Sequence, residues 1–231
     1  MIAIVTGGSS GIGKAICKKL AEEYQVINVS RRRESKEGGV LVDTHPNIVT
    51  EICDVRDIKA LQRVIEKYDA DVLINNVGIM PLKGFLEQSS DDYNNIMNTN
   101  FVSAVFATQS MLKKGRGHII NIASNSGLKA NPDSPIYGAS KAALVSFTKS
   151  IAAEYGNIIQ CNCICPGIID TRLVEGPSLP QKEIDKIPMG RIGQPEEIAE
   201  VVFGLLKSTY INGAVITVDG GQLQGVWRWG Q

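Results

Sequence analysis

Tyr137 and Lys141 stand four residues apart in the segment SPIYGASKAAL, where a turn rich in proline and serine runs into an alanine-rich stretch. Side chains at i and i+4 of a helix lie on one face, so this spacing brings a phenol and an ammonium together. A free phenol ionises near pH 10, and a neighbouring positive charge favours the phenolate. Lowering that pKa by about three units requires roughly 4 kcal/mol, which close and partly desolvated charges can supply. The pair is therefore a candidate general acid and base for a carbinol or carbonyl oxygen.

Taken alone, the same spacing would be better interpreted as a packed tyrosine beside a solvated lysine. The chemical interpretation is favoured by the motif TGGSSGIG at residues 6–13 and by Ser124, thirteen positions before the tyrosine. Ser124 follows the apolar run HIINIA, and ligands of open α/β sheets bind at the carboxyl ends of the strands. Its hydroxyl could hold a substrate oxygen beside Tyr137; a turn or capping role, or a catalytic role for Ser126 instead, are the alternatives.

The motif TGGSSGIG lies between an apolar strand-like run and a helical segment. Glycine allows a tight turn, and a helix N-terminus presents free N–H groups and the positive end of a dipole. This arrangement suits a pyrophosphate, so dinucleotide binding is favoured over a purely structural turn. The residues expected to contact the dinucleotide here are Thr6, Gly7, Ser9, Ser10, Gly11, Ile12 and Gly13.

The end of the second strand-like run, NVSRRRE, bears on which dinucleotide binds. NAD-dependent proteins usually carry an acidic residue at this point, which accepts hydrogen bonds from the ribose 2′-hydroxyl. Here Ser30 occupies the position, and Arg31, Arg32 and Arg33 follow. A guanidinium can bind a 2′-phosphate with paired hydrogen bonds, so NADP(H) is favoured, with Arg31 as the first candidate and Arg32 as the second. The alternatives are a solvated basic loop, and NAD(H) binding if Glu34 folds back.

Further short motifs follow in order along nearly the whole chain: CDV at 53–55, NNVG at 75–78, NTNF at 98–101, IASNSG at 122–127, YGASK at 137–141, CPGIIDT at 165–171 and VDGG at 218–221. Each is weak by itself, but together they resemble the short-chain dehydrogenase/reductase family in its compact branch. NNVG departs from the N-N-A-G of that family because Val77 replaces alanine, which adds bulk and keeps both asparagines.

The resemblance implies a catalytic set of Asn100, Ser124, Tyr137 and Lys141. Tyr137 would exchange the proton, Ser124 would orient the substrate oxygen, and Lys141 would bind the nicotinamide ribose and bias the phenol. Asn100 would hold a water that links Lys141 to solvent, with a satisfied core amide as its alternative role. The cofactor contacts implied beyond the first turn, with Asp54 near the adenine, are Asp54, Val55, Asn76, Val77, Gly78, Tyr137, Lys141, Pro166, Gly167, Ile169 and Thr171.

The activity that the resemblance implies is reversible hydride transfer between the nicotinamide and a ketone or secondary alcohol. The chain resembles 3-oxoacyl-(acyl-carrier-protein) reductases most and is nearly as similar to sugar and polyol dehydrogenases, which are the alternative. A regulatory protein that senses NADP(H) without turnover is a further hypothesis. The intact catalytic set disfavours it, because a sensor needs no proton relay. A homotetramer, or a homodimer, is also implied.

The elements that must position these residues alternate along the chain. Apolar runs that predict strands buried on both faces lie at 2–8, 25–30, 47–55, 71–76, 117–124, 157–167 and 212–221. Helical periodicity lies between them, at 13–24, 58–68, 91–114, 135–156 and 194–208. The alternation predicts an α/β fold, a single Rossmann-type domain over 1–231 whose doubly wound parallel sheet of about seven strands has helices on both faces. Gly38, Gly39 and Pro46 predict a short or irregular connection at 31–47.

Composition narrows the classes of function. The chain has 231 residues with 24 basic and 24 acidic side chains, so no basic excess indicates nucleic acid. Its apolar runs are too short for a bilayer and its start lacks a signal-peptide pattern, which favours a cytoplasmic protein. Cys161, Cys163 and Cys165 alternate along one strand face, and buried small hydrophobes are favoured over a metal site. No metal is expected.

The segment after Thr171 is expected to be a short substrate loop at about 171–193. Its apolar residues Leu173, Val174, Leu179 and Ile184 could wall a modest pocket for a small carbonyl or alcohol, with residues 80–88 opposite. The tail GVWRWGQ carries both tryptophans, and such aromatic tails often bury against a neighbouring subunit.

Overall fold

The computed structural model describes residues 1–31, 45–171 and 179–225. Seven parallel strands form one sheet in this part of the chain, in the order β3-β2-β1-β4-β5-β6-β7. Their bounds are β1 Ile2–Thr6, β2 Gln25–Ser30, β3 Ile48–Ile52, β4 Val72–Asn75, β5 Gly117–Ile122, β6 Ile159–Pro166 and β7 Val215–Val218. The order reverses between β1 and β4, and in doubly wound sheets this is the point where a ligand cleft opens.

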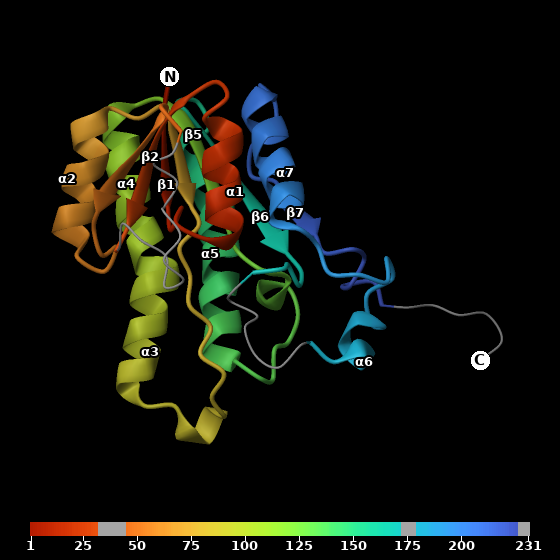
Figure 1. Cartoon of the computed structure of the whole chain (residues 1–231). Helices are drawn as coiled ribbons and strands as arrows, with labels where there is room; N and C mark the ends of the chain where they lie inside the picture. The colour runs from red at the N-terminus through yellow and green to blue at the C-terminus, as the bar shows by residue number, and fades with distance from the viewer. Residues whose placement is uncertain (32–44, 172–178, 226–231) are drawn as a thin grey trace.

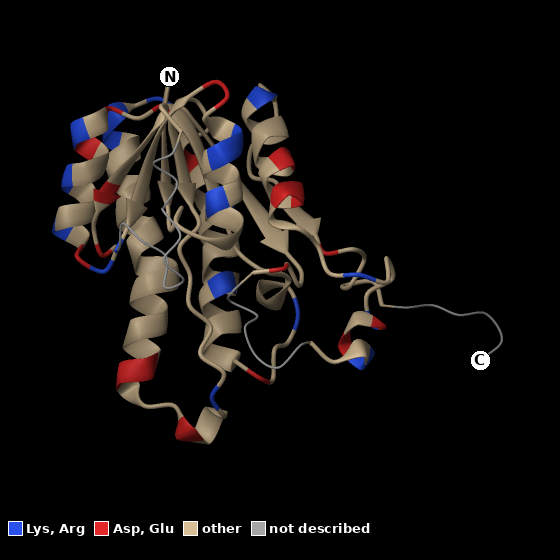
Figure 2. Cartoon of the chain, viewed as in Figure 1, with Lys and Arg blue, Asp and Glu red and all other residues tan. Residues whose placement is uncertain are grey.

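The strands form because their apolar runs are buried on both faces. In β1, Ala3 and Val5 face a core that includes α1 (Gly11–Leu20) and α7 (Pro195–Lys207), whereas Ile4 between them faces a core on the other side. Figure 1 shows the sheet between helices on its two faces, and Figure 2 shows that charged residues of both signs lie mainly on the helices and loops. The predicted doubly wound α/β sheet with helices on both faces is confirmed.

The helices divide between the two faces. One face is covered by α1 Gly11–Leu20 and α7 Pro195–Lys207, and the other by α2 Ile58–Tyr68, α4 Ser103–Lys114 and α5 Pro135–Tyr155. The shorter elements are the 3₁₀ turn η1 Phe85–Glu87, α3 Ser90–Met97, the π-helical turn η2 Asn98–Val102, the 3₁₀ turn η3 Asn125–Gly127 and α6 Gln181–Ile184.

One element differs from its prediction. The sequence predicts an uninterrupted helix over 91–114, whereas α3 and α4 are joined through the π-helical turn η2. A π turn inserts a residue into the helical repeat and often marks a functional position. Here the turn contains Asn100, which shares it with Thr99 and Phe101.

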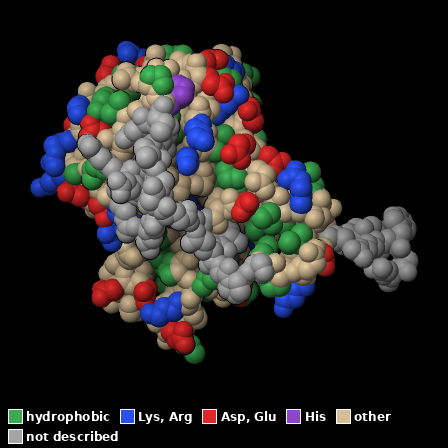
Figure 3. Space-filling view, viewed as in Figure 1, with side chains coloured by type: hydrophobic (Ala, Val, Ile, Leu, Met, Phe, Trp, Pro, Cys, Tyr) green, Lys and Arg blue, Asp and Glu red, His purple; other side chains and the backbone are tan. Residues whose placement is uncertain are grey.

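Some predictions fall outside the described residues. They concern most of the connection at 31–47, with Arg32, Arg33 and Glu34, and also Leu173, Val174 and most of the aromatic tail. Among the described helices, none combines the length and the apolar character needed to cross a membrane. On the face drawn in Figure 3, the described side chains of both charge signs are interspersed.

Candidate active site

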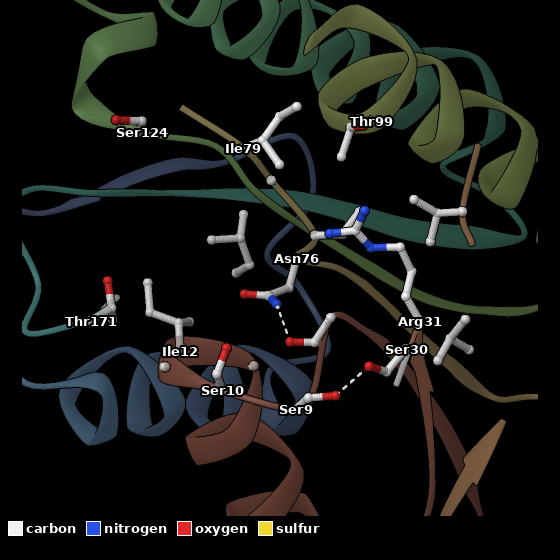
Figure 4. A pocket seen from close by; sticks show the side chains of 18 of the residues that line it. Ser9, Ser10, Ile12, Ser30, Arg31, Asn76, Ile79, Thr99, Ser124 and Thr171 are labelled. Atoms are coloured by element: carbon white, nitrogen blue, oxygen red, sulfur yellow. Dashed lines mark hydrogen bonds between the residues drawn. The ribbon is translucent and has the colours of Figure 1, made fainter. Parts of the chain in front are cut away.

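A cleft of about 690 Å³ lies at the carboxyl ends of the strands, a volume typical of ligand sites. Figure 4 shows Ser124 and Ile79 toward one end of it and Ser9, Ser30 and Arg31 toward the other. The residues of the sequence-based set that line the cleft are Gly7, Ser9, Ser10, Gly11, Ile12, Gly13, Ser30, Arg31, Asp54, Val55, Asn76, Val77, Gly78, Ser124, Tyr137, Lys141, Pro166, Gly167, Ile169 and Thr171.

Two of the residues predicted from the sequence, Thr6 and Asn100, are buried and do not line the cleft. Thr6 is buried at the end of β1, and its hydroxyl accepts hydrogen bonds from the backbone N–H groups of Asn76 and Val77, at 3.0 and 3.2 Å. It therefore fixes the segment after β4 rather than lining the cleft. Asn100 is also buried, 1% exposed, and does not line the cleft.

The glycine loop is built for close backbone packing. Gly7 has φ +71°, which favours glycine, and a Cβ on Gly13 would lie 2.3 Å from the carbonyl oxygen of Gly7. The Asn76 amide donates to the carbonyl oxygens of Thr6 and Gly7, at 2.9 and 3.3 Å, and so holds the loop from the β4 side. The loop geometry thus depends on glycines and on an asparagine that directly follows β4.

The first turn of α1 is open to a ligand. Its N-cap residue, Ser10, makes no side-chain capping bond, so the first N–H groups of the helix keep their donors for an anion. Ser10, Gly11 and Thr171 all line the cleft, and a Cβ on Gly11 would lie 2.9 Å from the Thr171 methyl carbon. These residues fit the pyrophosphate of a dinucleotide, with Thr171 opposite the loop.

Polar side chains gather at the β2 and β3 end of the cleft. The hydroxyls of Ser9 and Ser30 are hydrogen-bonded to each other, and Arg31 lies beside them (Figure 4). A guanidinium and two hydroxyls are donors that suit a 2′-phosphate. This end of the cleft therefore fits the adenosine half of a nicotinamide dinucleotide.

An ion pair that the sequence did not predict lies nearby. Arg56 contacts the Asp54 carboxylate with Nη2 at 2.6 Å and donates Nη1 to Asn95 Oδ1 at 2.8 Å. The hydrogen bonds from Arg56 hold the pKa of Asp54 below its usual value. The expected adenine contact, Asp54, is thus held by a basic neighbour two residues away and linked through it to α3.

Lys141 and Tyr137 face each other inside the protein. Lys141 is 3% exposed, its Nζ donates to the carbonyl oxygen of Ile122 at 2.8 Å, and the same atom lies 5.8 Å from the centre of the Tyr137 ring. A Cβ on Gly78 would lie 3.3 Å from this Nζ, so glycine leaves the ammonium its space. The spacing on α5 brings the two groups together as the sequence predicts.

The pKa of Tyr137 moves in the direction opposite to that expected from the sequence. Burial raises the pKa of the phenol, and a hydrogen bond with Ser124 lowers it by less. Burial also lowers the pKa of Lys141 from its usual 10.5 to about 8. The physical reason is that the same burial that brings the groups close also disfavours the charged form of each. Additional positive charge in the cleft would be needed to favour the phenolate.

The Ser124 side chain caps its own turn. Its hydroxyl oxygen accepts from the backbone N–H of Ser126 at 3.1 Å, and η3 begins directly after it. Ser124 lines the cleft and interacts with Tyr137, whereas Ser126 accepts a hydrogen bond from Asn131 and does not line the cleft. The geometry therefore favours Ser124 over Ser126 as the group beside the phenol.

Asn100 joins the cleft wall to α5. Its Oδ1 accepts from the N–H of Ile79 at 2.8 Å, and its Nδ2 donates to the carbonyl oxygen of Ile79 at 3.0 Å and to the hydroxyl of Ser140 at 3.1 Å. The Ser140 hydroxyl in turn donates to the carbonyl oxygen of Tyr137 at 2.7 Å. Asn100 is thus linked to the backbone carbonyl of Tyr137 through Ser140, and its own amide is fully hydrogen-bonded, as in a satisfied core amide.

Sequence reasoning missed part of the wall: Val29, Cys53, Arg56, Ile79, Asn95, Thr99, Ile122 and Ala123. Most flank a predicted motif residue, so proximity along the chain was a usable signal for them. Asn95 has no such signal, because only the packing of α3 brings it to the cleft. The described residues hold no group of three or more His, Cys, Asp or Glu side chains placed to bind a metal ion. All five cysteines are free and buried, as the sequence predicts for Cys161, Cys163 and Cys165.

Comparison with known proteins agrees with this geometry. A family model for enoyl-(acyl carrier protein) reductase matches residues 7–222. The chain is 38% identical to carbonyl reductase family member 4 of Xenopus tropicalis, over 96% of this chain and 98% of the relative. It is 33% identical to the 3-oxoacyl-(acyl-carrier-protein) reductase FabG of Thermotoga maritima, over 95% and 96%. The solved structure of ElxO with NADP bound superposes with a TM-score of 0.88 at 31% identity, over 96% and 98%.

The fold, the cleft and these relatives define an oxidoreductase that uses a nicotinamide cofactor. The chain belongs to the short-chain dehydrogenase/reductase family.

Proposed function

We propose that the protein is a cytoplasmic, homotetrameric, NADPH-preferring carbonyl reductase that interconverts a 3-oxoacyl-type ketone and its secondary alcohol. The observation that carries the proposal is the meeting of Ser124, Tyr137 and Lys141 in one cleft with the open N-terminus of α1. The nicotinamide, when bound, supplies or accepts the hydride. The chain supplies the proton and the orientation of the substrate.

Each side chain has one role in this proposal. In the reducing direction, the neutral Tyr137 hydroxyl donates its proton to the substrate oxygen, and the raised pKa of Tyr137 keeps that proton in place at neutral pH. Ser124 hydrogen-bonds the same oxygen. Lys141, held by the carbonyl oxygen of Ile122, binds the nicotinamide ribose and keeps a positive charge next to the phenol. Asn100 positions Tyr137 through Ser140.

The NADPH preference is supported by the donors at the adenosine end. Ser9, Ser30 and Arg31 line that end, and no aspartate or glutamate stands among residues 24–31 at the end of β2. ElxO, the structural relative, binds NADP. NADH remains the alternative cofactor, and it would lose the contact with Arg31.

The substrate class is supported by the relatives, which include a carbonyl reductase family member and a 3-oxoacyl-(acyl-carrier-protein) reductase. Ile79, which lines the cleft on the side of Ser124, is apolar and suits an acyl chain (Figure 4). A sugar or polyol is the alternative substrate.

The proposal is tested by following NADPH and NADH absorbance with a panel of carbonyls: ethyl 3-oxobutanoate, acetoacetyl-CoA, a cyclic ketone and a keto-sugar. We expect the 3-oxoacyl compounds to be reduced fastest, and with NADPH. Tyr137→Phe should still bind NADPH, measured by fluorescence titration, and lose at least a hundredfold in turnover, since general acid catalysis is worth about 10²–10⁴-fold. Tyr155→Phe, on the same helix but outside the cleft, is the matched control. Unchanged turnover in Tyr137→Phe would refute the role of the phenol.

A further inference from the structure

The turn that carries Ser124, residues 124–127, is held by two separate contacts. It packs against α5, where a Cβ on Gly127 would lie 2.7 Å from the carbonyl carbon of Lys141. In addition Asn125, which is 6% exposed, donates Nδ2 to Oε1 of Gln222 at 2.7 Å. Gln222 lies 97 residues further along the chain, in the turn after β7.

Gln222 is itself held by a well-bonded turn, residues 219–224. The Asp219 carboxylate accepts from the N–H groups of Gly221 and Leu223, at 3.0 and 2.9 Å. The N–H of Gln222 donates to the carbonyl oxygen of Asp219 at 3.0 Å. The side chain of Gln222 therefore starts from a fixed backbone and presents its Oε1 to the Ser124 turn.

The same oxygen also abuts the wall of the cleft. A Cβ on Gly167, which follows β6 and lines the cleft, would lie 3.1 Å from Oε1 of Gln222. Gln222 thus fills the space between the Ser124 turn and the segment after β6. Its removal would leave the buried Asn125 amide without its acceptor and leave a gap beside the turn, and both changes favour a shift of the turn.

We propose that Gln222 is a positioning residue for Ser124, acting through Asn125 to hold the serine hydroxyl in place beside Tyr137 in the cleft. The inference rests on the proposed function in so far as Ser124 and Tyr137 are the catalytic pair. Hydrogen bonds weaken steeply with distance and angle, so a small displacement of the 124–127 turn is enough to weaken the serine's contact with the phenol and with a substrate oxygen.

The kinetic test compares Gln222→Ala with Gln224→Ala, an exposed glutamine of the same turn that is hydrogen-bonded through its backbone N–H to the carbonyl oxygen of Gly221. For the carbonyl that the wild type reduces fastest, kcat of Gln222→Ala should fall roughly tenfold, since misplacement of about 1 Å can cost up to about 100-fold. The Kd for NADPH should stay within about twofold, and Gln224→Ala should behave as wild type. Gln222→Met, similar in size but without the acceptor, should repeat the loss if the alanine variant does not fold.

A double-mutant cycle tests the route through Asn125. Asn125→Ala should lower kcat about as much as Gln222→Ala, and the double variant should be no slower than either single variant, because both remove the same hydrogen bond. Fully additive losses of kcat in the double variant would overturn the proposal. An unchanged kcat in both Gln222→Ala and Gln222→Met would overturn it as well.

A spectroscopic readout is independent of turnover. The phenolate absorbance of Tyr137 is recorded after alkaline pH jumps, before unfolding, as the difference between each protein and its Tyr137→Phe counterpart. The hydrogen bond with Ser124 lowers the pKa of Tyr137. If Gln222→Ala weakens this bond, the phenol of Tyr137 should titrate at a higher pH in that variant than in the wild type. In Gln224→Ala the phenol should titrate as in the wild type. If the wild type reduced no carbonyl, the proposed function would fail while this titration would still test the positioning. An unmoved titration would overturn the positioning role.

Discussion

At the scale of single residues, burial dominates the electrostatics of the site. Tyr137 and Lys141 are adjacent, yet burial raises the pKa of the phenol and lowers that of the lysine to about 8. In the free protein at neutral pH, the phenol therefore keeps its proton and most of the lysine is charged. In the proposed reduction, this is the protonation state in which the phenol can donate its proton.

The buried ammonium should cost stability in a pH-dependent way. Lowering the pKa of Lys141 from 10.5 to about 8 corresponds to about 3 kcal/mol, at 1.36 kcal/mol for each tenfold change in proton affinity. Lys141→Met should raise the free energy of unfolding at pH 7 by roughly 1–3 kcal/mol while turnover is lost. Between pH 8 and 10.5, Lys141 keeps its proton in the unfolded chain but releases it in the folded wild type. The stability of the wild type therefore rises with pH over this range, and the extra stability of Lys141→Met becomes smaller.

Urea unfolding at pH 7 and at pH 9.5 measures this difference, with Lys149→Met, an exposed lysine of the same helix, as the control. If the free energy of unfolding of Lys141→Met exceeded that of the wild type by the same amount at both pH values, the burial argument would be contradicted.

The guanidinium at the end of β2 should determine cofactor choice. Arg31→Ala removes a charged donor, worth about 1.5–3 kcal/mol with an anionic partner, so Kd for NADPH should rise roughly 10- to 100-fold. Kd for NADH should change less than about threefold. Fluorescence titration with both cofactors checks this, and Arg63→Ala, exposed on α2, is the control. An equal loss for both cofactors would argue against 2′-phosphate recognition.

At the scale of elements, the site depends on a few close backbone contacts between turns and helices. The 124–127 turn packs closely against α5 because Gly127 has no side chain. In the glycine loop, the backbone of Gly13 lies close to the carbonyl oxygen of Gly7 because Gly13 has no side chain. The π turn η2 turns the Asn100 amide toward Ile79 and Ser140. These contacts set the distances among the catalytic groups.

Two glycine substitutions should separate close packing from helix propensity. Gly127→Ala would place a Cβ 2.7 Å from the carbonyl carbon of Lys141, so we expect a loss of about 1–3 kcal/mol in stability and at least a tenfold loss in turnover. Gly204→Ala lies in α7, where nothing is within 4 Å of the added Cβ, and should stabilise by about 1 kcal/mol without affecting turnover. Thermal unfolding and the carbonyl assay check both. Full activity in Gly127→Ala would show that the turn tolerates displacement.

At the scale of the whole molecule, both core layers share one sheet, which supports the proposal that residues 1–231 form a single domain. The proposed homotetramer requires a surface where helices of different copies can approach. The outer face of α5 carries small exposed residues, Ala139, Ala142 and Ser146. Such residues allow helix axes to come within about 8–10 Å.

A bulky charge on this face should therefore dissociate the assembly. We expect Ser146→Arg to reduce the mass measured by light scattering on gel filtration, and Ser146→Ala to leave it unchanged. Ser146 is exposed, so the arginine should not disturb the fold of the single chain. An Arg variant with the wild-type mass would place the interface elsewhere.

The alternation of strands and helices could be predicted from local patterns, because apolar runs and helical periodicity are local properties of the chain. The sequence also located the glycine loop, Ser30 and Arg31, Ser124, Tyr137 and Lys141, because each follows a strand or shares a helical face. It did not determine the π turn around Asn100, since the local pattern there is that of an ordinary helix.

The residues that support the site from a distance, and the charge states of Tyr137 and Lys141, could be found from the tertiary structure alone. Asn95 reaches Arg56, and Gln222 reaches Asn125, across 39 and 97 residues of chain, and no local pattern encodes such contacts. The direction of the pKa shift of Tyr137 likewise depends on how completely the surrounding elements exclude water. Proximity to a cation can be read from spacing along a helix, whereas burial is a property of the assembled fold.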